Sequence, residues 1–398
     1  MATAAERSRG PHLTAVLREE ARVTPLELFF DLVFVLALTQ CTALMAAEPT
    51  WTGVAKGLAI LGVMWWAWVG YSWLTSVVDP EEGSVRVAMF TAMAALLIVS
   101  LCVPGAFGDE ALLFAIAYAF VRGLQVTLFA VASRDDPGLR HSVVGLAIST
   151  AIGVGLLTAA AFTDGTLQGV LWGAALVLDV GGPMLIDTSG WRLMPEHFAE
   201  RHGLIVIIAL GESIVAIGVG AEAGVTAGVA AAAVVGVALA AAQWWLYFDV
   251  VALVAARRLE NAEAGTERNE IARDSYSYLH FPMVAGIVLV ALGMKKTLGD
   301  TGDPLKLVPA VALLGGAAMY LLAHVAFRWR NIHTLNRQRL VVAIGLVAFI
   351  PLAVALPALV AAAILSGVSI ALVAYEAIRF GEARERLRRR LLHETVPE

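Results

Sequence analysis

Apolar residues gather along the chain into twelve runs of about 20 residues, separated mostly by short polar segments. A helix of that length crosses the ~30 Å hydrocarbon layer of a bilayer. One long polar insertion interrupts the pattern, RRLENAEAGTERNEIARDS at residues 257–275. The pattern predicts an all-α fold, a polytopic integral membrane protein with about twelve transmembrane helices. The runs begin near Leu26, Thr52, Val85, Ala111, Ser142, Leu167, Gly203, Thr226, Tyr276, Leu307, Leu340 and Ala358.

Composition supports a lipid environment. Of 398 residues, 59% are hydrophobic and 15% are charged, and the mean hydropathy is +0.77. A soluble domain carries roughly 25% charged residues, so this chain has more apolar surface than one water-soluble core can hide. Lipid accepts helices, because they satisfy their backbone hydrogen bonds internally. Nucleic-acid binding is not indicated, since no basic segment other than the C-terminal tail would support it.

Metal and cofactor sites are not indicated either. Cys41 and Cys102 both lie inside apolar runs, where free cysteine packs as a small hydrophobic residue. No two histidines share a helical face at the spacing of metal ligands, and no glycine-rich phosphate loop precedes a strand. We therefore expect no metal, no cofactor and no disulfide framework.

The basic residues predict the orientation, because Lys and Arg gather in the cytoplasmic loops of membrane proteins. With both termini inside, the inner segments hold 23 of the 28 basic residues. We predict a cytoplasmic N-terminal arm at residues 1–23 and a basic cytoplasmic tail at residues 382–398. The loop between runs nine and ten departs from the rule, with Lys295, Lys296 and Lys306.

A faint internal repeat relates runs six apart. MWWAWVGYSW in run two resembles AQWWLYFDVV in run eight, and ELFFDLVFVLALTQ from Glu27 aligns with ERHGLIVIIALGES from Glu200. Six is an even number, so both copies have the same orientation, as in some transporter classes. We predict two six-helix halves, at residues 24–190 and 191–381. In this alignment the tryptophan pair Trp65 and Trp66 matches Trp244 and Trp245.

Several ionisable residues fall inside the runs, where a charge costs at least ~2.5 kcal/mol at the helix centre. Such residues face the bundle interior or a water-filled cavity and mark substrate or ion pathways. A static ion pair or a hydrogen-bonded packing residue is the competing interpretation. The candidates for a substrate or ion pathway are Glu212, Asp31, Glu27, Arg122, His280, Asp179, Asp249 and His324.

Four of the candidates come with a more specific expectation. Glu27 and Asp31 lie one helical turn apart on one face, and they repel each other unless a proton or a cation lies between them. Arg122 is the expected counter-ion of one of the acids. Glu212 lies near the middle of run seven, where Gly211 and Gly218 would let another helix approach closely.

Two motifs in combination carry a resemblance to a known family. LELFFDLVFVLALTQ near the N-terminus and ERHGLIVIIALGESIVAIG past mid-chain, followed by YSYLHFPMVAGIVL, resemble the bacterial low temperature requirement protein A (LtrA) family. The resemblance runs from Val23 to Phe380 and implies a multi-pass inner-membrane protein. The family is named for a growth phenotype in the cold and has no settled biochemical activity. His202 departs from the aromatic residue expected there, and the positions that match are Glu27, Asp31, Glu200, Glu212 and His280.

Three classes of function fit these features. A proton- or ion-coupled transporter of an unidentified small solute fits best, since it accounts for the many spans, the repeat and the acids within the bundle. An ion or proton channel is the alternative, because carboxylates and titratable chains also line pores. An intramembrane enzyme fits less well: EEGSVR at residues 81–86 matches the EExxxR pattern of membrane glutamyl proteases, but it falls in a loop and no HxxxN follows. We expect no enzyme, with the lipid bilayer and the solute as partners.

Overall fold

The computed structural model describes residues 22–185, 190–220, 224 and 226–393. Within these residues every regular element is a helix. The first part of the chain forms α1 (Pro25–Ala47), α2 (Trp51–Thr75), α3 (Gly83–Leu101), a short 3-10 turn (Val103–Gly105), α4 (Ala111–Ala132), α5 (Pro137–Ala160) and α6 (Gly165–Leu185). The second forms α7 (Pro195–Gly220), α8 (Ala227–Phe248), α9 (Val251–Glu260), α10 (Thr266–Ile271), the π-helix η2 (Ala272–Tyr278), α11 (His280–Gly299), α12 (Leu307–Ile332), α13 (Arg337–Ala353) and α14 (Ala358–His393).

Each predicted apolar run coincides with one of these helices, and the all-α membrane fold is confirmed. Ten of the described helices are long and apolar enough to cross a membrane, which makes the chain a multi-pass membrane protein. Helices α7 and α13 are not among the ten, and α13 has only 17 residues. The count of twelve spans and the division into two halves therefore stay predictions. Most of the predicted N-terminal arm, residues 1–21, lies outside the described residues, as do residues 394–398 of the tail.

Local sequence signals set several of the helix starts. Thr24 and Glu27 form a capping box at α1, in which the Thr24 hydroxyl accepts from the Glu27 N–H and Glu27 accepts from the Thr24 N–H. Asp136 caps α5 ahead of Pro137, and Asn336 caps α13. These side chains satisfy N–H groups that have no partner within the helix, which keeps the helix ends compatible with a membrane interior.

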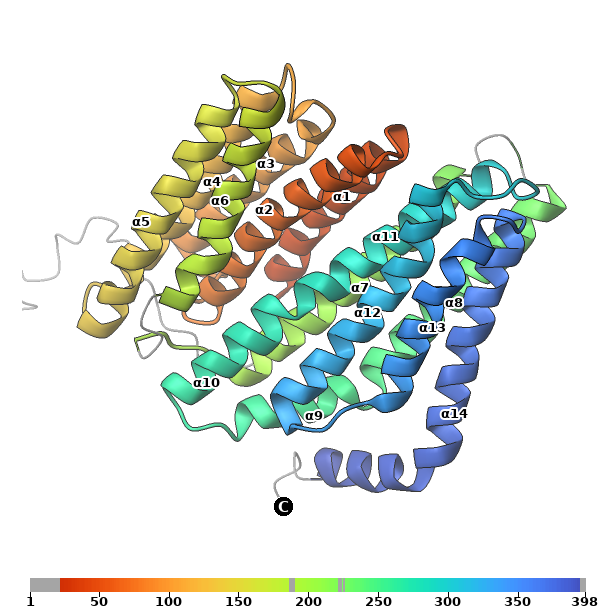
Figure 1. The fold of residues 1–398 in the computed structure, drawn as a ribbon. Coiled ribbons are helices and arrows are strands. Elements are labelled where there is room, and N and C mark those ends of the chain that lie inside the picture. The colour runs from red at the N-terminus through yellow and green to blue at the C-terminus, as the bar shows by residue number, and fades with distance from the viewer. Residues whose placement is uncertain (1–21, 186–189, 221–223, 225, 394–398) are drawn as a thin grey trace, which may run out of the picture.

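The helices form one elongated bundle (Figure 1), with α3 to α6 at one side and α8, α12, α13 and α14 at the other. Helices α1 and α2 lie between them, and α1 packs against α7 and α11. The closest helix contact joins α11 to α12, where a Cβ on Gly286 would lie 2.6 Å from the Gly316 carbonyl oxygen. Only glycine permits backbones to approach so closely.

One prediction about packing is wrong. A Cβ added at Gly211 or at Gly218 would have no atom of another described helix within 4 Å. These glycines therefore do not make a close helix contact beside Glu212. The tryptophan pairs of the proposed repeat also differ in environment. Trp65 and Trp66 are buried, whereas Trp244 and Trp245 are 44% and 43% exposed, because the first pair faces the bundle interior and the second does not.

Helical geometry breaks at two places beside candidate residues. Asp249 lies at the end of α8, before the chain resumes as α9. Further along, η2 widens to π-helical turns just before α11. In a π-helix the bonding N–H lies five residues on, and for Ser277 that residue is Pro282, which has no N–H. The Ser277 carbonyl instead accepts from the indole N–H of Trp65 at 2.8 Å, so the irregular turn fixes α2 to η2.

Candidate functional site

A charged cluster joins the start of α1 to the start of α7. Arg201 lies between the two carboxylates of α1, with Nη1 3.0 Å from Glu27 Oε1 and Nη2 2.7 Å from Asp31 Oδ1. His197 Nε2 lies 2.8 Å from the same Glu27 oxygen, and the indole of Trp68 donates to Asp31 Oδ1 at 2.8 Å. All four ionisable side chains are fully buried. The expected cation between Glu27 and Asp31 is therefore a side chain of the protein itself.

The hydrogen bonds of His197 are compatible with two protonation states of its ring. Its Nε2 faces the Glu27 carboxylate, which only accepts, so this nitrogen carries a hydrogen. Its Nδ1 lies 3.1 Å from Ser76 Oγ, and that hydroxyl also lies 3.0 Å from the Ser72 carbonyl. When the hydroxyl donates to Ser72, Nδ1 must donate to it and the ring is a cation. When the hydroxyl turns to donate to Nδ1, the ring is neutral.

The net charge of the four side chains differs between these two states of His197. With His197 protonated, two carboxylates face two cations, and the four side chains sum to zero. With His197 neutral they carry one net negative charge. Asp31 Oδ2 is buried without a hydrogen-bond partner in the described part of the chain, which is a second position where a proton would be held. The hydrogen bonds of the cluster are therefore compatible with either charge state.

Sequence reasoning missed Arg201 and His197. Counting run seven from Gly203 placed both in a loop, whereas α7 begins eight residues earlier, at Pro195. The signal was present, because Pro195 at the first helical position with Glu196 after it is typical of a helix start. The basic-residue count was therefore wrong at Arg201, which lies inside α7 and is fully buried.

A second buried pair joins α4 to α6. Arg122 Nη2 lies 3.6 Å from Asp179 Oδ1, which confirms Arg122 as the counter-ion of a membrane acid. Arg122 also donates to the Trp66 carbonyl and to Gln125 Oε1, each at 2.9 Å, and to Thr150 Oγ1 at 3.0 Å. These bonds tie one guanidinium to α2, α4, α5 and α6 and hold it in one orientation.

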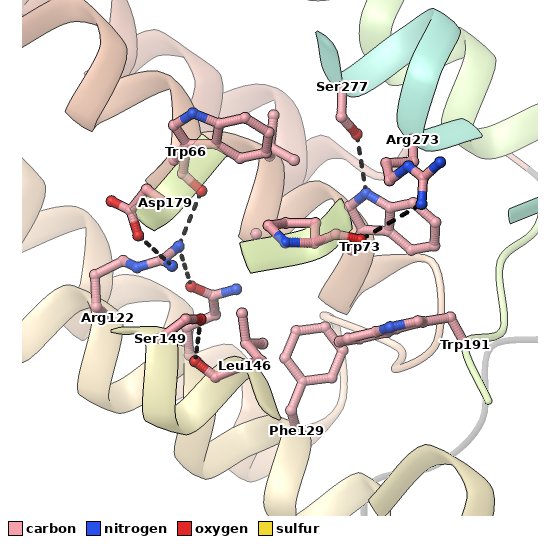
Figure 2. Close-up of a pocket in the computed structure, with 14 residues that line it drawn as sticks. Trp66, Trp73, Arg122, Phe129, Leu146, Ser149, Asp179, Trp191, Arg273 and Ser277 are labelled. Atoms are coloured by element: carbon pink, nitrogen blue, oxygen red, sulfur yellow. Dashed lines mark hydrogen bonds and ion pairs between the residues drawn. The ribbon is translucent and has the colours of Figure 1, made fainter. Parts of the chain in front are cut away.

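This pair forms part of the wall of a cavity (Figure 2). The space open to the centres of water molecules is about 70 Å³. Arg122 and Asp179 lie on one side, and Arg273 and Trp191 on the other. Other lining residues include Trp66, Gly70, Trp73, Gln125, Phe129 and Ser277. The lining therefore combines four aromatic rings with convergent polar and charged groups, which is the usual character of a small-molecule site.

A second, apolar cavity adjoins the first on the same three elements, α2, α6 and the segment from η2 into α11. Ala55, Leu58 and Gly62 line it from α2, and Phe281 and Ala285 line it from α11. Trp66 lines both cavities. Its ring makes an edge contact with Tyr278, at 5.1 Å between centroids, and the Tyr278 hydroxyl donates to the Val180 carbonyl of α6. Trp66 is therefore the side chain that the two cavities share, and Tyr278 lines the second.

Glu212 joins neither the cluster nor the cavity. Its carboxylate is buried and accepts a hydrogen bond from Thr39 of α1. Thr39 follows Asp31 by eight residues, which is about 12 Å along a helix axis. The structure does not bring together the two acids that the sequence singled out most strongly, because α1 and α7 contact each other along their length and Glu212 meets a different turn.

The remaining candidates lie elsewhere in the second part of the chain. His280 Nδ1 donates to the Ser275 carbonyl at 3.1 Å, so its Nε2 accepts from the Tyr247 hydroxyl at 2.8 Å. His324 accepts from Arg339, whose guanidinium forms a two-fold contact with Glu376 at 2.9 and 2.8 Å. Both histidines are held as neutral, hydrogen-bonded residues. Asp249 is half-buried at the end of α8.

The packing around the cluster explains why His202 fits the fold. Its ring lies 5.0 Å from Trp68 and 5.2 Å from His280, measured between centroids. Its Nδ1 donates to the Phe198 carbonyl at 2.9 Å, so the ring packs as an aromatic residue would. Both cysteines are free and buried, and no group of three or more metal-ligating side chains occurs within residues 22–185, 190–220, 224 and 226–393.

Comparison with known proteins identifies the family but no activity. A protein of Rhizobium meliloti (strain 1021), named Uncharacterized protein RA0937, is 31% identical over 307 residues, which cover 74% of each chain. No solved structure matches the chain. The model of the family described as bacterial low temperature requirement A protein (LtrA) matches residues 22–374. The chain therefore belongs to the LtrA family.

Proposed function

We propose that this protein is a proton-coupled carrier of a small solute, and not an enzyme. The observation that supports this most directly is the pair of cavities on α2, α6 and the η2 to α11 segment, which share Trp66, whose ring contacts Tyr278. A solute in the first cavity would reach the second when these two rings part. A carrier needs such a closed site between two spaces, whereas a channel needs one continuous path.

The predicted orientation gives the two cavities a direction. With both termini cytoplasmic, Trp73 and Arg273 of the first cavity lie toward the cytoplasm, and Ala55 and Leu58 of the second lie toward the outside. The first cavity would then bind solute in the inward-facing state. This orientation, and the inner membrane of the bacterial cell, are part of the proposal.

Proton coupling is assigned to the cluster of Glu27, Asp31, His197 and Arg201. It changes by one unit of charge when His197 binds or releases a proton, and it lies between α1, α2 and α7. Helix α2 connects it to the cavities, because Trp68 donates to Asp31 while Trp66, two residues away, lines both cavities. A change in the cluster charge would act on α2 directly.

The experiment uses the purified full-length chain in proteoliposomes, with metabolite mixtures inside and a pH gradient imposed. A carrier releases a solute at a rate that saturates with its concentration and that shows counterflow. Trp66→Ala should convert saturable flux into a leak, while Trp244→Ala, an exposed tryptophan outside both cavities, should leave it unchanged. Ohmic single-channel steps in the unmodified protein would instead establish the channel alternative.

A further inference from the structure

The first cavity contains hydrogen-bond donors that no described residue satisfies. Gln125 is 1% exposed, and its Oε1 accepts from Arg122. Its Nε2 has no partner in the described chain, and neither has Nε of Arg122. A buried N–H group without an acceptor is unfavourable, and native structures contain few of them. A ligand that offers oxygen acceptors would satisfy these donors.

The lining residues also carry an excess of positive charge. Arg122 and Arg273 are set against one carboxylate, Asp179. Asp274 does not offset this, because it lies outside the lining and is shared between Arg273, at 2.8 Å, and Arg330, at 3.0 Å. Asp179 is itself occupied by Arg122 and by the Tyr118 hydroxyl at 3.3 Å. One negative charge on the ligand balances the site.

Aromatic rings form the rest of the wall. Trp191 makes edge contacts with Trp73 and Phe129, at 5.8 and 5.1 Å between centroids, and Figure 2 shows these rings on the side of the cavity away from Asp179. Trp73 is fixed because its indole donates to Ser277 Oγ at 3.0 Å. Rigid rings of this kind favour a flat, apolar partner.

The volume of the first cavity limits the size of the ligand. A space of about 70 Å³ for water centres holds about five water molecules, which take up about 150 Å³ in the liquid. This is room for a single ring with one small substituent and is too little for a fused polycycle.

We infer that the first cavity binds a small monocarboxylate with a flat apolar body, its carboxylate held by Gln125 and Arg122. This assignment rests on the proposed carrier function and names the class of its solute. The carboxylate oxygens accept from Gln125 Nε2 and from the Arg122 guanidinium, and the ring packs among Trp73, Trp191 and Phe129.

The test is equilibrium binding of benzoate to the full-length chain in lipid nanodiscs, with benzamide and benzylamine as the neutral and cationic probes. We expect benzoate to bind and the other two to bind at least tenfold more weakly. Gln125→Met keeps the volume and removes the amide, and it should weaken benzoate binding between about tenfold and hundredfold, the range for one hydrogen bond to a charged group.

Gln243→Met is the matched control. Gln243 is also a buried glutamine whose amide lacks partners in the described chain, but it lies on α8 and does not line the cavity, so benzoate binding should not change. Equal loss in both variants would mean general damage to the fold and would overturn the site. Preferential binding of benzylamine would overturn the carboxylate assignment.

Transport measurements separate this inference from the carrier proposal. Uptake of a different solute that depends on Trp66 would leave the carrier standing and reject the monocarboxylate. Benzoate binding that depends on Gln125, in a protein that releases no solute from proteoliposomes, would keep the ligand class and reject the carrier.

Discussion

The charged cluster and the first cavity are both buried polar sites, yet they are constructed differently. In the cluster, Glu27, Asp31, His197 and Arg201 are fully buried and contact one another at 2.7 to 3.0 Å. In the cavity, Arg122 and Asp179 are 3.6 Å apart and border open space. Buried charges in direct contact leave no room for a ligand, whereas a looser pair beside an unsatisfied amide does.

This difference separates two tasks that one membrane protein must perform. A group that only gains or loses a proton needs no space for a ligand, and one proton changes the net charge of the cluster by one unit. A solute needs volume, donors and apolar walls. Four substitutions test whether the cluster and the cavity have separate tasks.

Removing Arg201 should have the largest effect. Arg201→Met leaves Glu27 and Asp31 buried without their cation, which costs about 3–5 kcal/mol in comparable cases. We expect little folded protein, measured as the yield of monodisperse protein in detergent and as its melting temperature. Adding Glu27→Gln and Asp31→Asn should recover much of the loss.

Lys56→Met is the control, because it removes a partly exposed charge and not a buried one. Lys56 pairs with Glu48 at 3.5 Å and is one-third exposed, so its removal should cost at most about 1 kcal/mol. A melting temperature for Arg201→Met as high as that of this control would contradict the central role of Arg201.

Gly70→Ala should damage the cavity and spare the cluster. A Cβ at this position would lie 2.0 Å from Gln125 Nε2, so the amide must turn away from its place. We expect solute binding to fall at least tenfold, as for removal of the amide itself, with a melting temperature near that of the unmodified protein. Gly123→Ala, on the neighbouring α4 with open space around it, should change neither quantity.

His197→Gln should affect coupling more than binding. Glutamine can still donate to Glu27, but it cannot bind a proton, so the cluster keeps one charge state at every pH. In the unmodified protein, His197 binds a proton at low pH, and the four side chains of the cluster then carry no net charge. We expect the variant to bind solute normally and to lose accumulation driven by a pH gradient, measured in proteoliposomes. Gradient-driven accumulation equal to that of the unmodified protein would exclude His197 as the coupling site.

Glu212→Gln should have the smallest effect. The side chain accepts from Thr39 and lies outside both regions, and glutamine can still accept that hydrogen bond. We expect transport close to the unmodified rate, because glutamine keeps this hydrogen bond and the side chain lines neither the cluster nor the cavity. Complete loss of transport, or of growth in the cold, would place Glu212 in the pathway after all.

Particular residues show which parts of the site can be predicted from the sequence and which cannot. Arg122 was predicted to pair with a membrane acid, and it pairs with Asp179, 57 positions away. Glu27 and Asp31 were predicted to need a cation, but Arg201 was assigned to a loop because hydropathy does not recognise a polar first helical turn. Gln125 carried no signal, since a single uncharged glutamine in an apolar run is ordinary until its unpaired amide is located beside a cavity.

The sequence by itself determined that the chain enters a membrane as helices, which segments form them and that several charges are buried with them. These follow from local quantities: the length of apolar runs, the cost of charge in lipid and the residues that cap helices. Only the tertiary structure decided which charges meet. Partners come from helices far apart in the chain, and a rotation of one residue along a helix, about 100°, turns a side chain from a cavity into lipid.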